Sequence, residues 1–134
     1  MANEAVIIEL LGNGGDPIRF TVANATGIEK GTLLKVADPR TASATSADND
    51  AFAGIAASEK VASDGATTLA AYTHGIFDLK DSGAGITAGE RVSIAGANLI
   101  SKVAAADLLF ADVGIALETA SASEVIAVLV GSGF

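Results

Sequence analysis

Two stretches of this chain recur with the same glycine spacing, and the recurrence limits the folds open to it. Residues 27–36 return as residues 85–94, and residues 51–56 return as residues 111–116. Both copies of the first stretch read Gly-Ile-x-x-Gly, in which the glycines permit the positive φ angles of a tight turn. The shared positions hold glycines and β-branched residues, which shape a backbone. The repeat therefore predicts a duplicated architecture and no particular chemistry.

The second repeated stretch carries a glycine inside an otherwise strand-like run. Gly54 and Gly114 hold this position, and such a glycine usually marks a β-bulge or a close approach of two backbones. Three phenylalanines also recur at equal spacing: Phe20, Phe77 and Phe134. Since alanine and glycine are abundant here, chance similarity is the alternative to duplication. Two units are too few for a solenoid, so the repeat favours a barrel of two pseudo-symmetric halves.

Short apolar runs bounded by glycine, proline, asparagine and aspartate predict strands along the whole chain. The expected strands are residues 4–11, 18–23, 32–37, 52–57, 67–73, 76–79, 91–94, 99–103, 113–118 and 124–130. Residues 38–50 are small and polar and are expected to form a surface loop. Residues 104–109 are the one helical candidate, because alanine favours helix there. The pattern predicts an all-β barrel or sandwich.

We divide the chain into an N-terminal extended arm or first strand, residues 1–16, and a single β domain, residues 17–134. Within that domain the two pseudo-repeats are placed at about residues 18–76 and 77–134. Half of the residues are hydrophobic, but only 4% are aromatic. Small buried side chains contribute little area to a core. We therefore expect association between copies to supply part of the stability.

The charge pattern argues against polyphosphate partners. The chain has 16 acidic and 8 basic side chains, a net charge of −8, and its basic residues are scattered singly along the sequence. Nucleic-acid binding needs concentrated positive charge, so no nucleic-acid partner is expected. The longest apolar run, residues 125–130, is too short to cross a bilayer. With no secretion signal visible, we expect a soluble protein made in the cytoplasm, with no membrane partner.

Residues able to do chemistry are few. His74 is the only histidine and there is no cysteine, so neither a multi-histidine nor a thiolate metal site can form. Asp48, Asp50 and Asp64 lie in expected loops, but their spacing lacks that of a calcium-binding loop. Lys80 is the nearest candidate for the modified lysine of a biotinyl or lipoyl carrier domain, although the flanking methionines are absent. The sequence predicts no enzyme activity, no metal and no cofactor.

A series of segments in a fixed order runs through nearly the whole chain. The segments are residues 4–11, 20–23, 27–36, 52–56, 74–79, 85–92 and 113–118. In this order the chain resembles the capsid cement, or head decoration, proteins of tailed bacterial and archaeal viruses. The resemblance implies a β-barrel or β-tulip-like domain, usually a homotrimer, that binds the major capsid protein on the outer surface of the expanded shell. Residues 38–50 are a polar insertion relative to that pattern.

The resemblance directs the search for contact residues to the parts outside the repeat, residues 4–11 and 38–50. Val6, Ile7 and Ile8 are predicted to contact the capsid, as an arm that adds a strand to a neighbouring sheet. The alternative is a first strand in the domain's own sheet. Phe77 and Phe134 are predicted to contact sister subunits. The competing functions are a carbohydrate- or cell-binding β-module, poorly supplied with aromatic residues, and the carrier domain.

Overall fold

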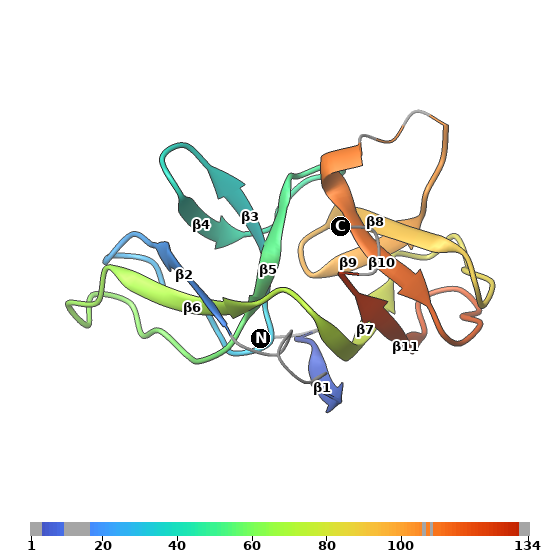
Figure 1. The fold of residues 1–134 in the computed structure, drawn as a ribbon, viewed down its shortest axis with the longest axis horizontal. Helices are drawn as coiled ribbons and strands as arrows, with labels where there is room; N and C mark the ends of the chain where they lie inside the picture. Colours follow the sequence, from blue (N-terminus) through green and yellow to red (C-terminus); the bar gives the residue numbers. More distant parts are fainter. Residues whose placement is uncertain (1–3, 10–16, 106, 108, 132–134) are drawn as a thin grey trace.

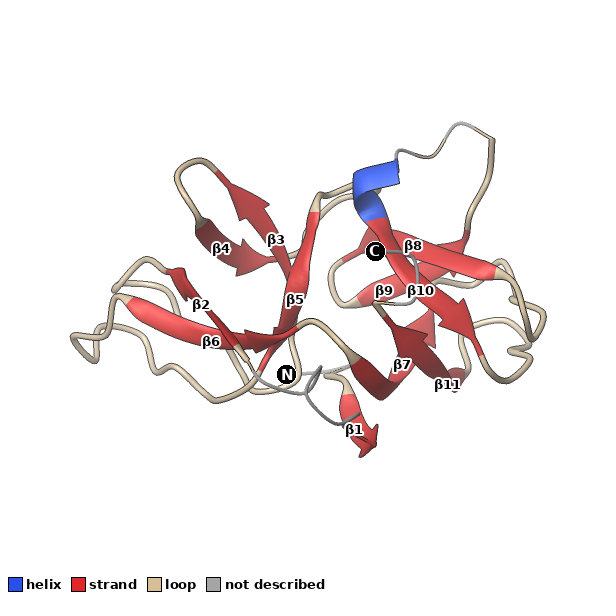
Figure 2. Ribbon diagram, in the orientation of Figure 1, coloured by secondary structure: helices blue, strands red, loops and turns tan. Residues whose placement is uncertain are grey.

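We describe the protein from a computed structural model, which defines residues 4–9, 17–105, 107 and 109–131. Within these residues the chain forms strands joined by turns, with one short helical segment near the top of the view (Figure 2). The all-β prediction is confirmed. Two barrels lie side by side along the long axis, blue to green on the left and yellow to red on the right (Figure 1).

The first barrel, here called the N-terminal barrel, closes in the order β2-β4-β3-β5-β6. Its strands are β2 (Ile18–Thr21), β3 (Leu33–Ala37), β4 (Thr41–Ala44), β5 (Phe52–Ala56) and β6 (Thr68–Tyr72). The C-terminal barrel has the order β7-β11-β10-β8-β9 and closes through β7 and β9. Its strands are β7 (Gly75–Asp81), β8 (Arg91–Gly96), β9 (Leu99–Lys102), β10 (Asp112–Ala116) and β11 (Val125–Val130). Strand β1 (Val6–Glu9) pairs with β7.

The two barrels have the same strand pairings in the same order. In each barrel the first strand pairs in parallel with the third, and the remaining neighbours are antiparallel. Equivalent positions can therefore be read from the register. Phe20 pairs with Leu69 of β6, and Leu79 pairs with Ile126 of β11. Leu69 and Ile126 hold the same position in their barrels, so Phe20 is equivalent to Leu79. The equal spacing of Phe20 and Phe77 is thus not a structural repeat, since Phe77 is equivalent to Ile18.

A bulge interrupts the same strand pair in both barrels, at the repeated glycines. The register shifts between β3 and β5 beside Gly54, and between β8 and β10 beside Gly114. A Cβ atom on Gly54 would lie 2.8 Å from the carbonyl oxygen of Tyr72, and one on Gly114 would overlap the carbonyl of Leu129. The expectation of a bulge and close backbone approach is confirmed at both positions. We propose that this shared device and pairing order descend from one duplicated unit.

Two local predictions are corrected. The expected loop over residues 38–50 contains strand β4, which forms a hairpin with β3 and is equivalent to β9, so it is not an insertion. Its small residues alternate, with Ala42 buried and Ser43 exposed, and this period of two suits a strand. The one described helix, η2 (Leu109–Ala111), begins where the predicted helix ended. Before it, the Asp107 carboxylate accepts the N–H of Ala104, which favours a turn.

Two hydrophobic clusters form the core. The smaller fills the N-terminal barrel and is half alanine: Val22, Ile28, Leu34, Ala42, Ala53, Ala56, Leu69 and Ala71. The larger fills the C-terminal barrel and extends across the junction, because it includes Leu33 and Ile55 from the N-terminal barrel. Phe77 and Leu79 of β7 belong to the same cluster. The barrels therefore share a continuous core at their junction.

Polar contacts fasten the same junction. The Asn98 side-chain oxygen accepts a hydrogen bond from the backbone N–H of Leu33, and the Asn98 N–H donates to the Thr45 hydroxyl. Beside them, the Asn49 N–H donates to the carbonyl of Ile94. The loop after β4 thus lies over the edge of the C-terminal barrel, while the β8–β9 turn reaches into the N-terminal one. This arrangement fixes the two barrels relative to each other.

Candidate functional site

The N-terminal segment crosses from one barrel to the other. The N–H of Ala5 donates to the carbonyl of Gly31, 2.6 Å away, and Ala5 is buried. A Cβ atom at Gly31 would overlap the Ala5 carbonyl, so this approach requires glycine. The next residues pair antiparallel with β7, Val6 opposite Asp78 and Ile7 opposite Phe77. The segment is therefore a strand of the protein's own sheet, the second of the two predicted alternatives.

Alternation along β1 divides its side chains between core and solvent. Ile7 packs against the large cluster, whereas Val6 is 54% and Ile8 53% exposed. No other strand of the described residues pairs with the outer edge of β1. We name Val6 and Ile8 the β1 ridge. Of the three residues predicted to contact the capsid, these two are placed where a partner could reach them.

Acidic groups adjoin the β1 ridge. Asp78 lies opposite Val6 in the strand pair, so the two side chains share one face of the sheet. Burial raises the pKa of Asp78 above its usual range, and the charge of Glu118 raises it further. The Glu118 carboxylate also accepts the N–H of Ala127. The ridge is thus apolar at its crest and negatively charged beside it.

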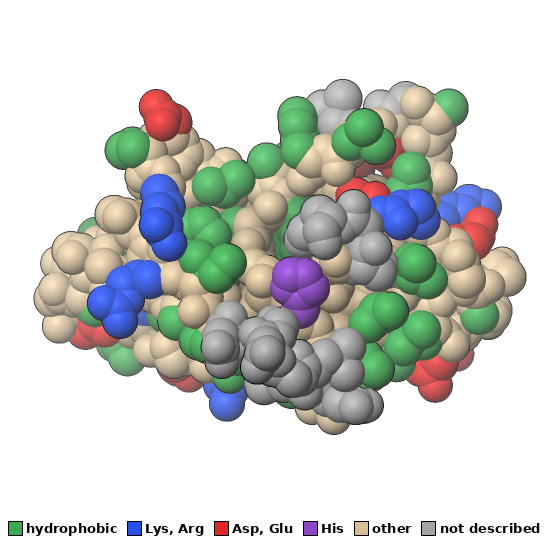
Figure 3. Space-filling model, viewed as in Figure 1, with side chains coloured by type: hydrophobic (Ala, Val, Ile, Leu, Met, Phe, Trp, Pro, Cys, Tyr) green, Lys and Arg blue, Asp and Glu red, His purple; other side chains and the backbone are tan. Residues whose placement is uncertain are grey.

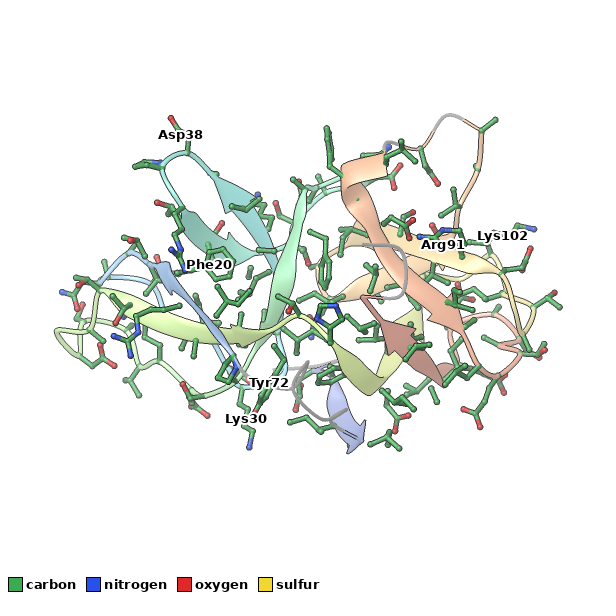
Figure 4. The ribbon with its side chains drawn as sticks, viewed as in Figure 1. Phe20, Lys30, Asp38, Tyr72, Arg91 and Lys102 are labelled. Atoms are coloured by element: carbon green, nitrogen blue, oxygen red, sulfur yellow. The ribbon has the colours of Figure 1, made fainter. Side chains whose placement is uncertain are left out.

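One of the two residues predicted to contact sister subunits is buried. Phe77 has no exposed area, and its ring lies 6.1 Å from that of Tyr72, between centroids, at the barrel junction. It could reach another subunit only if the barrel opened. Phe134 lies outside the described residues. Figure 4 shows Tyr72 at this junction, with Phe20 in the N-terminal barrel to its upper left.

The candidates for chemistry occupy structural positions. Lys80 lies within β7, between Val125 of β11 and Leu99 of β9, and not at the hairpin tip that a carrier lysine occupies. His74 follows β6, and its ring contacts the Thr73 hydroxyl. His74 and Lys80 are both half-buried.

Two of the three loop aspartates stabilise turns. Asp50 accepts the N–H groups of Ser46 and Ala47 and pairs with Lys35. Burial opposes ionisation there, but those hydrogen bonds and the lysine charge prevail and lower the pKa of Asp50. The hydrogen bond from the Ala66 N–H, with help from Lys60, likewise lowers the pKa of Asp64. Asp48 instead forms a backbone bridge with Ala95 across the junction.

No group of three or more histidine, aspartate or glutamate side chains within the described residues could hold a metal ion. In the same part of the chain, no helix has the length and hydrophobicity needed to span a membrane. The sequence pattern did not identify two exposed apolar residues, Leu109 and Phe110, at the η2 turn. Their only signal is a run of three large apolar residues, 108–110, between Asp107 and Ala111, which is typical of a buried segment as well.

Comparison with known proteins identifies the family. The family model described as "Phage cement protein" matches residues 12–131, which include both barrels. No curated protein matches the chain. The matched range begins after β1, so the β1 ridge lies outside it. Phage cement proteins are structural proteins of the virion capsid, where they associate with the shell and stabilise it. On this match, the chain belongs to the phage cement protein family.

Proposed function

We propose that this protein is a capsid decoration protein that binds the major capsid protein on the outer surface of an icosahedral phage head and stabilises the expanded shell. The observation that carries the proposal is the family match across both barrels. The fold supports it, because two closed barrels joined by an apolar cluster that extends across their junction suit a rigid structural part. Many such bodies bound at symmetric positions reinforce a shell through repeated contacts.

The proposed contact with the shell is the β1 ridge. Val6 and Ile8 expose two β-branched side chains on a strand whose outer edge has no partner among the described residues. Such an edge offers backbone hydrogen bonds to an extended segment of the capsid protein. The adjacent Asp78 and Glu118 favour a partner surface that carries basic groups.

The remaining parts of the proposal concern assembly and location. The protein is made in the host cytoplasm, associates as a homotrimer and acts without catalysis or a cofactor. The small, alanine-rich core of the N-terminal barrel supports self-association, because it buries little apolar area within one chain. A carbohydrate-binding module is the rival function. It is less well supported, since Phe110 is the one exposed aromatic side chain among the described residues and Tyr72 is half-buried against Phe77, whereas sugars stack on platforms of exposed rings.

The experiment is co-sedimentation of the purified protein with expanded and unexpanded heads that lack it. We expect saturable binding to expanded heads, and at least about tenfold weaker binding by a Val6→Ser/Ile8→Ser variant. Val125→Ser is the matched control, because Val125 is an equally exposed strand residue, at 57%, on another strand. Absence of wild-type binding contradicts the proposed function. Equal binding by the ridge variant contradicts only the proposed contact.

Removal of residues 2–11 is not an equivalent test. Ala5 bonds to Gly31, and Ile7 packs against the large cluster. A truncated chain would expose part of the core at the barrel junction, so lost binding could reflect lost folding. Substitutions at Val6 and Ile8 leave both of those contacts in place.

A further inference from the structure

At the junction, a hairpin end of one barrel meets a loop of the other. Each barrel has both a hairpin end and a loop of this kind, and only one of the two takes part in the junction. The C-terminal barrel contributes the end of its β8–β9 hairpin, with Asn98 and Ile94. The N-terminal barrel contributes the loop after β4, beginning at Thr45, with Asn49 further along it. Because the strand pairings are the same, the N-terminal barrel has an equivalent hairpin end and the C-terminal barrel has an equivalent loop, and neither takes part in the junction.

The unused hairpin end lies on the N-terminal barrel. We call it the hairpin face, and its residues are Ile18, Phe20, Val36 and Arg40. By register, Ile18 is equivalent to Phe77 and Val36 to Ile94. Ile18 is 40% and Val36 39% exposed, whereas both equivalents are fully buried at the junction. The difference arises because the N-terminal barrel covers Phe77 and Ile94, whereas nothing in the described chain covers Ile18 and Val36.

Arg40 and Asn98 extend the comparison to the tip of the hairpin. Both residues directly precede the second strand of the hairpin, and both have a positive φ, 47° and 58°. Asn98 is buried against Leu33, while Arg40 is exposed and its Nε donates to the carbonyl of Arg19. The hairpin face thus presents a guanidinium group beside exposed apolar side chains. In Figure 3 blue side chains flank green ones over the left barrel.

The unused loop lies on the C-terminal barrel, after β9. The Val103 N–H donates to the carbonyl of Arg91, and the Thr45 N–H donates to the carbonyl of Leu33. Since Arg91 and Leu33 are equivalent, Val103 is equivalent to Thr45. Thr45 is buried at the junction, but Val103 is 41% exposed. Further along the same loop Leu109 and Phe110 are 90% and 58% exposed. We call Val103, Leu109 and Phe110 the loop face.

The two faces lie on different barrels: Figure 1 shows β3 and β4 in the left barrel, and η2, which carries Leu109 and Phe110, at the upper inner side of the right barrel. Figure 4 shows Phe20 and Asp38, which mark the side of the hairpin face, in the left barrel, and Arg91 and Lys102 in the right barrel. One copy can therefore present its loop face to the hairpin face of the next. This geometry repeats the contact between the barrels within one chain.

A contact between copies would differ from the junction within one chain in a way that weakens it. At the junction within the chain, Leu33 and Ile55 are fully buried apolar residues. At the equivalent positions of the C-terminal barrel, Arg91 replaces Leu33, and its guanidinium pairs with Asp112, which replaces Phe52. An ion pair must lose part of its hydration when it is covered. Contact between copies is therefore expected to be weaker than the junction and to form reversibly.

We propose that a second copy of this chain covers the hairpin face with its loop face, head to tail, in the arrangement that the two barrels already use within one chain. The proposal gives surfaces to the self-association in the proposed function and rests on that part of it, not on binding to the shell. A head-to-tail contact is heterologous, so it closes into a ring or continues as a filament. A closed ring of three copies is the proposed homotrimer.

The test is sedimentation equilibrium of the full chain, without capsids, over a wide range of concentration. Val36→Asp alters the hairpin face, with Ile18→Asp as a second variant, and Phe110→Asp alters the loop face, with Leu109→Asp as a second. Each is expected to weaken self-association at least about tenfold. Val61→Asp is the matched control, because Val61 is 61% exposed but lies outside both faces. Circular dichroism checks that every variant is folded.

A mixture of the two kinds of variant gives the sharpest result. Val36→Asp keeps an intact loop face and Phe110→Asp an intact hairpin face, so an equimolar mixture is expected to form a dimer and nothing larger. A mixture that stays monomeric, or a wild-type chain that is monomeric at every concentration, overturns the proposal. Self-association unchanged in all four face variants overturns it as well. Co-sedimentation with heads is measured separately, so failure to bind the shell is distinguished from failure to self-associate.

Discussion

The carboxamide oxygen of Asn98 accepts a hydrogen bond from the backbone N–H of Leu33 at 2.5 Å, and the contact joins two barrels across 65 positions of sequence. Both residues are buried. Loss of the carboxamide leaves the Leu33 N–H buried without its acceptor, which costs about 1–3 kcal/mol. The positive φ of Asn98 also disfavours most replacements.

We therefore expect Asn98→Ala to lower the free energy of unfolding by about 2–4 kcal/mol, from the hydrogen bond and the backbone strain together. Asn98→Gly loses the carboxamide but tolerates the positive φ without strain, so its loss should be smaller. Urea unfolding monitored by circular dichroism measures both. Equal stability of the alanine variant and the wild type would show that this contact does not fasten the junction.

Gly114→Ala tests the bulge. A Cβ atom there would overlap the Leu129 carbonyl of the neighbouring strand, so β10 and β11 must separate. We expect a loss of roughly 3 kcal/mol, typical of severe overpacking. Gly89→Ala is the control, because it has a positive φ but nothing within 4 Å of the added atom. It should lose only the 1–2 kcal/mol or so of left-handed strain, and thermal unfolding would compare the two.

Asp78 gives a prediction about pH. Burial and the charge of Glu118 raise its pKa in the folded state. Ionisation therefore favours the unfolded chain, so the contribution to stability is complete below the unfolded pKa and is lost as the pH rises through the folded pKa. Asp78→Asn should be more stable than the wild type at pH 7, by less than about 1 kcal/mol because the side chain is only half-buried.

The difference between Asp78→Asn and the wild type should shrink as the pH falls through the folded pKa of Asp78 and disappear below the unfolded pKa. Urea unfolding at a series of pH values measures it. Asp38→Asn, at the exposed tip of the β3–β4 hairpin, controls for the change in net charge. A constant difference between the Asp78 variant and the wild type at all pH values would contradict the assignment.

Local sequence rules predicted the features that depend on backbone geometry. Gly54 and Gly114 interrupt strand-like runs, and each lies at a bulge where a Cβ atom would collide with the next strand. Strand β4 was missed because Thr41–Ala44 has small side chains, whose alternation gives little contrast in hydrophobicity. The all-β prediction is correct although β4 was missed, because many short apolar runs along the chain support it.

The candidate surfaces were identified from the strand pairing in the structure more than from the sequence pattern. Val6 and Ile8 were identifiable as exposed only after Ile7 was seen to pack inward against β7. Phe77 is in the core because the N-terminal barrel covers it, while its equivalent, Ile18, is half exposed. No local pattern distinguishes these two positions. The contacts between the barrels decide them, and those contacts join residues far apart in sequence.

The most direct test of reinforcement of the shell is the temperature at which packaged DNA becomes accessible to a DNA-binding dye. Expanded, DNA-filled heads prepared without this protein are heated alone, with saturating wild-type protein, or with the Val6→Ser/Ile8→Ser variant. We predict that the wild type raises the release temperature in proportion to its occupancy on the shell, and that the variant does so far less. An unchanged release temperature at full wild-type occupancy would contradict the account.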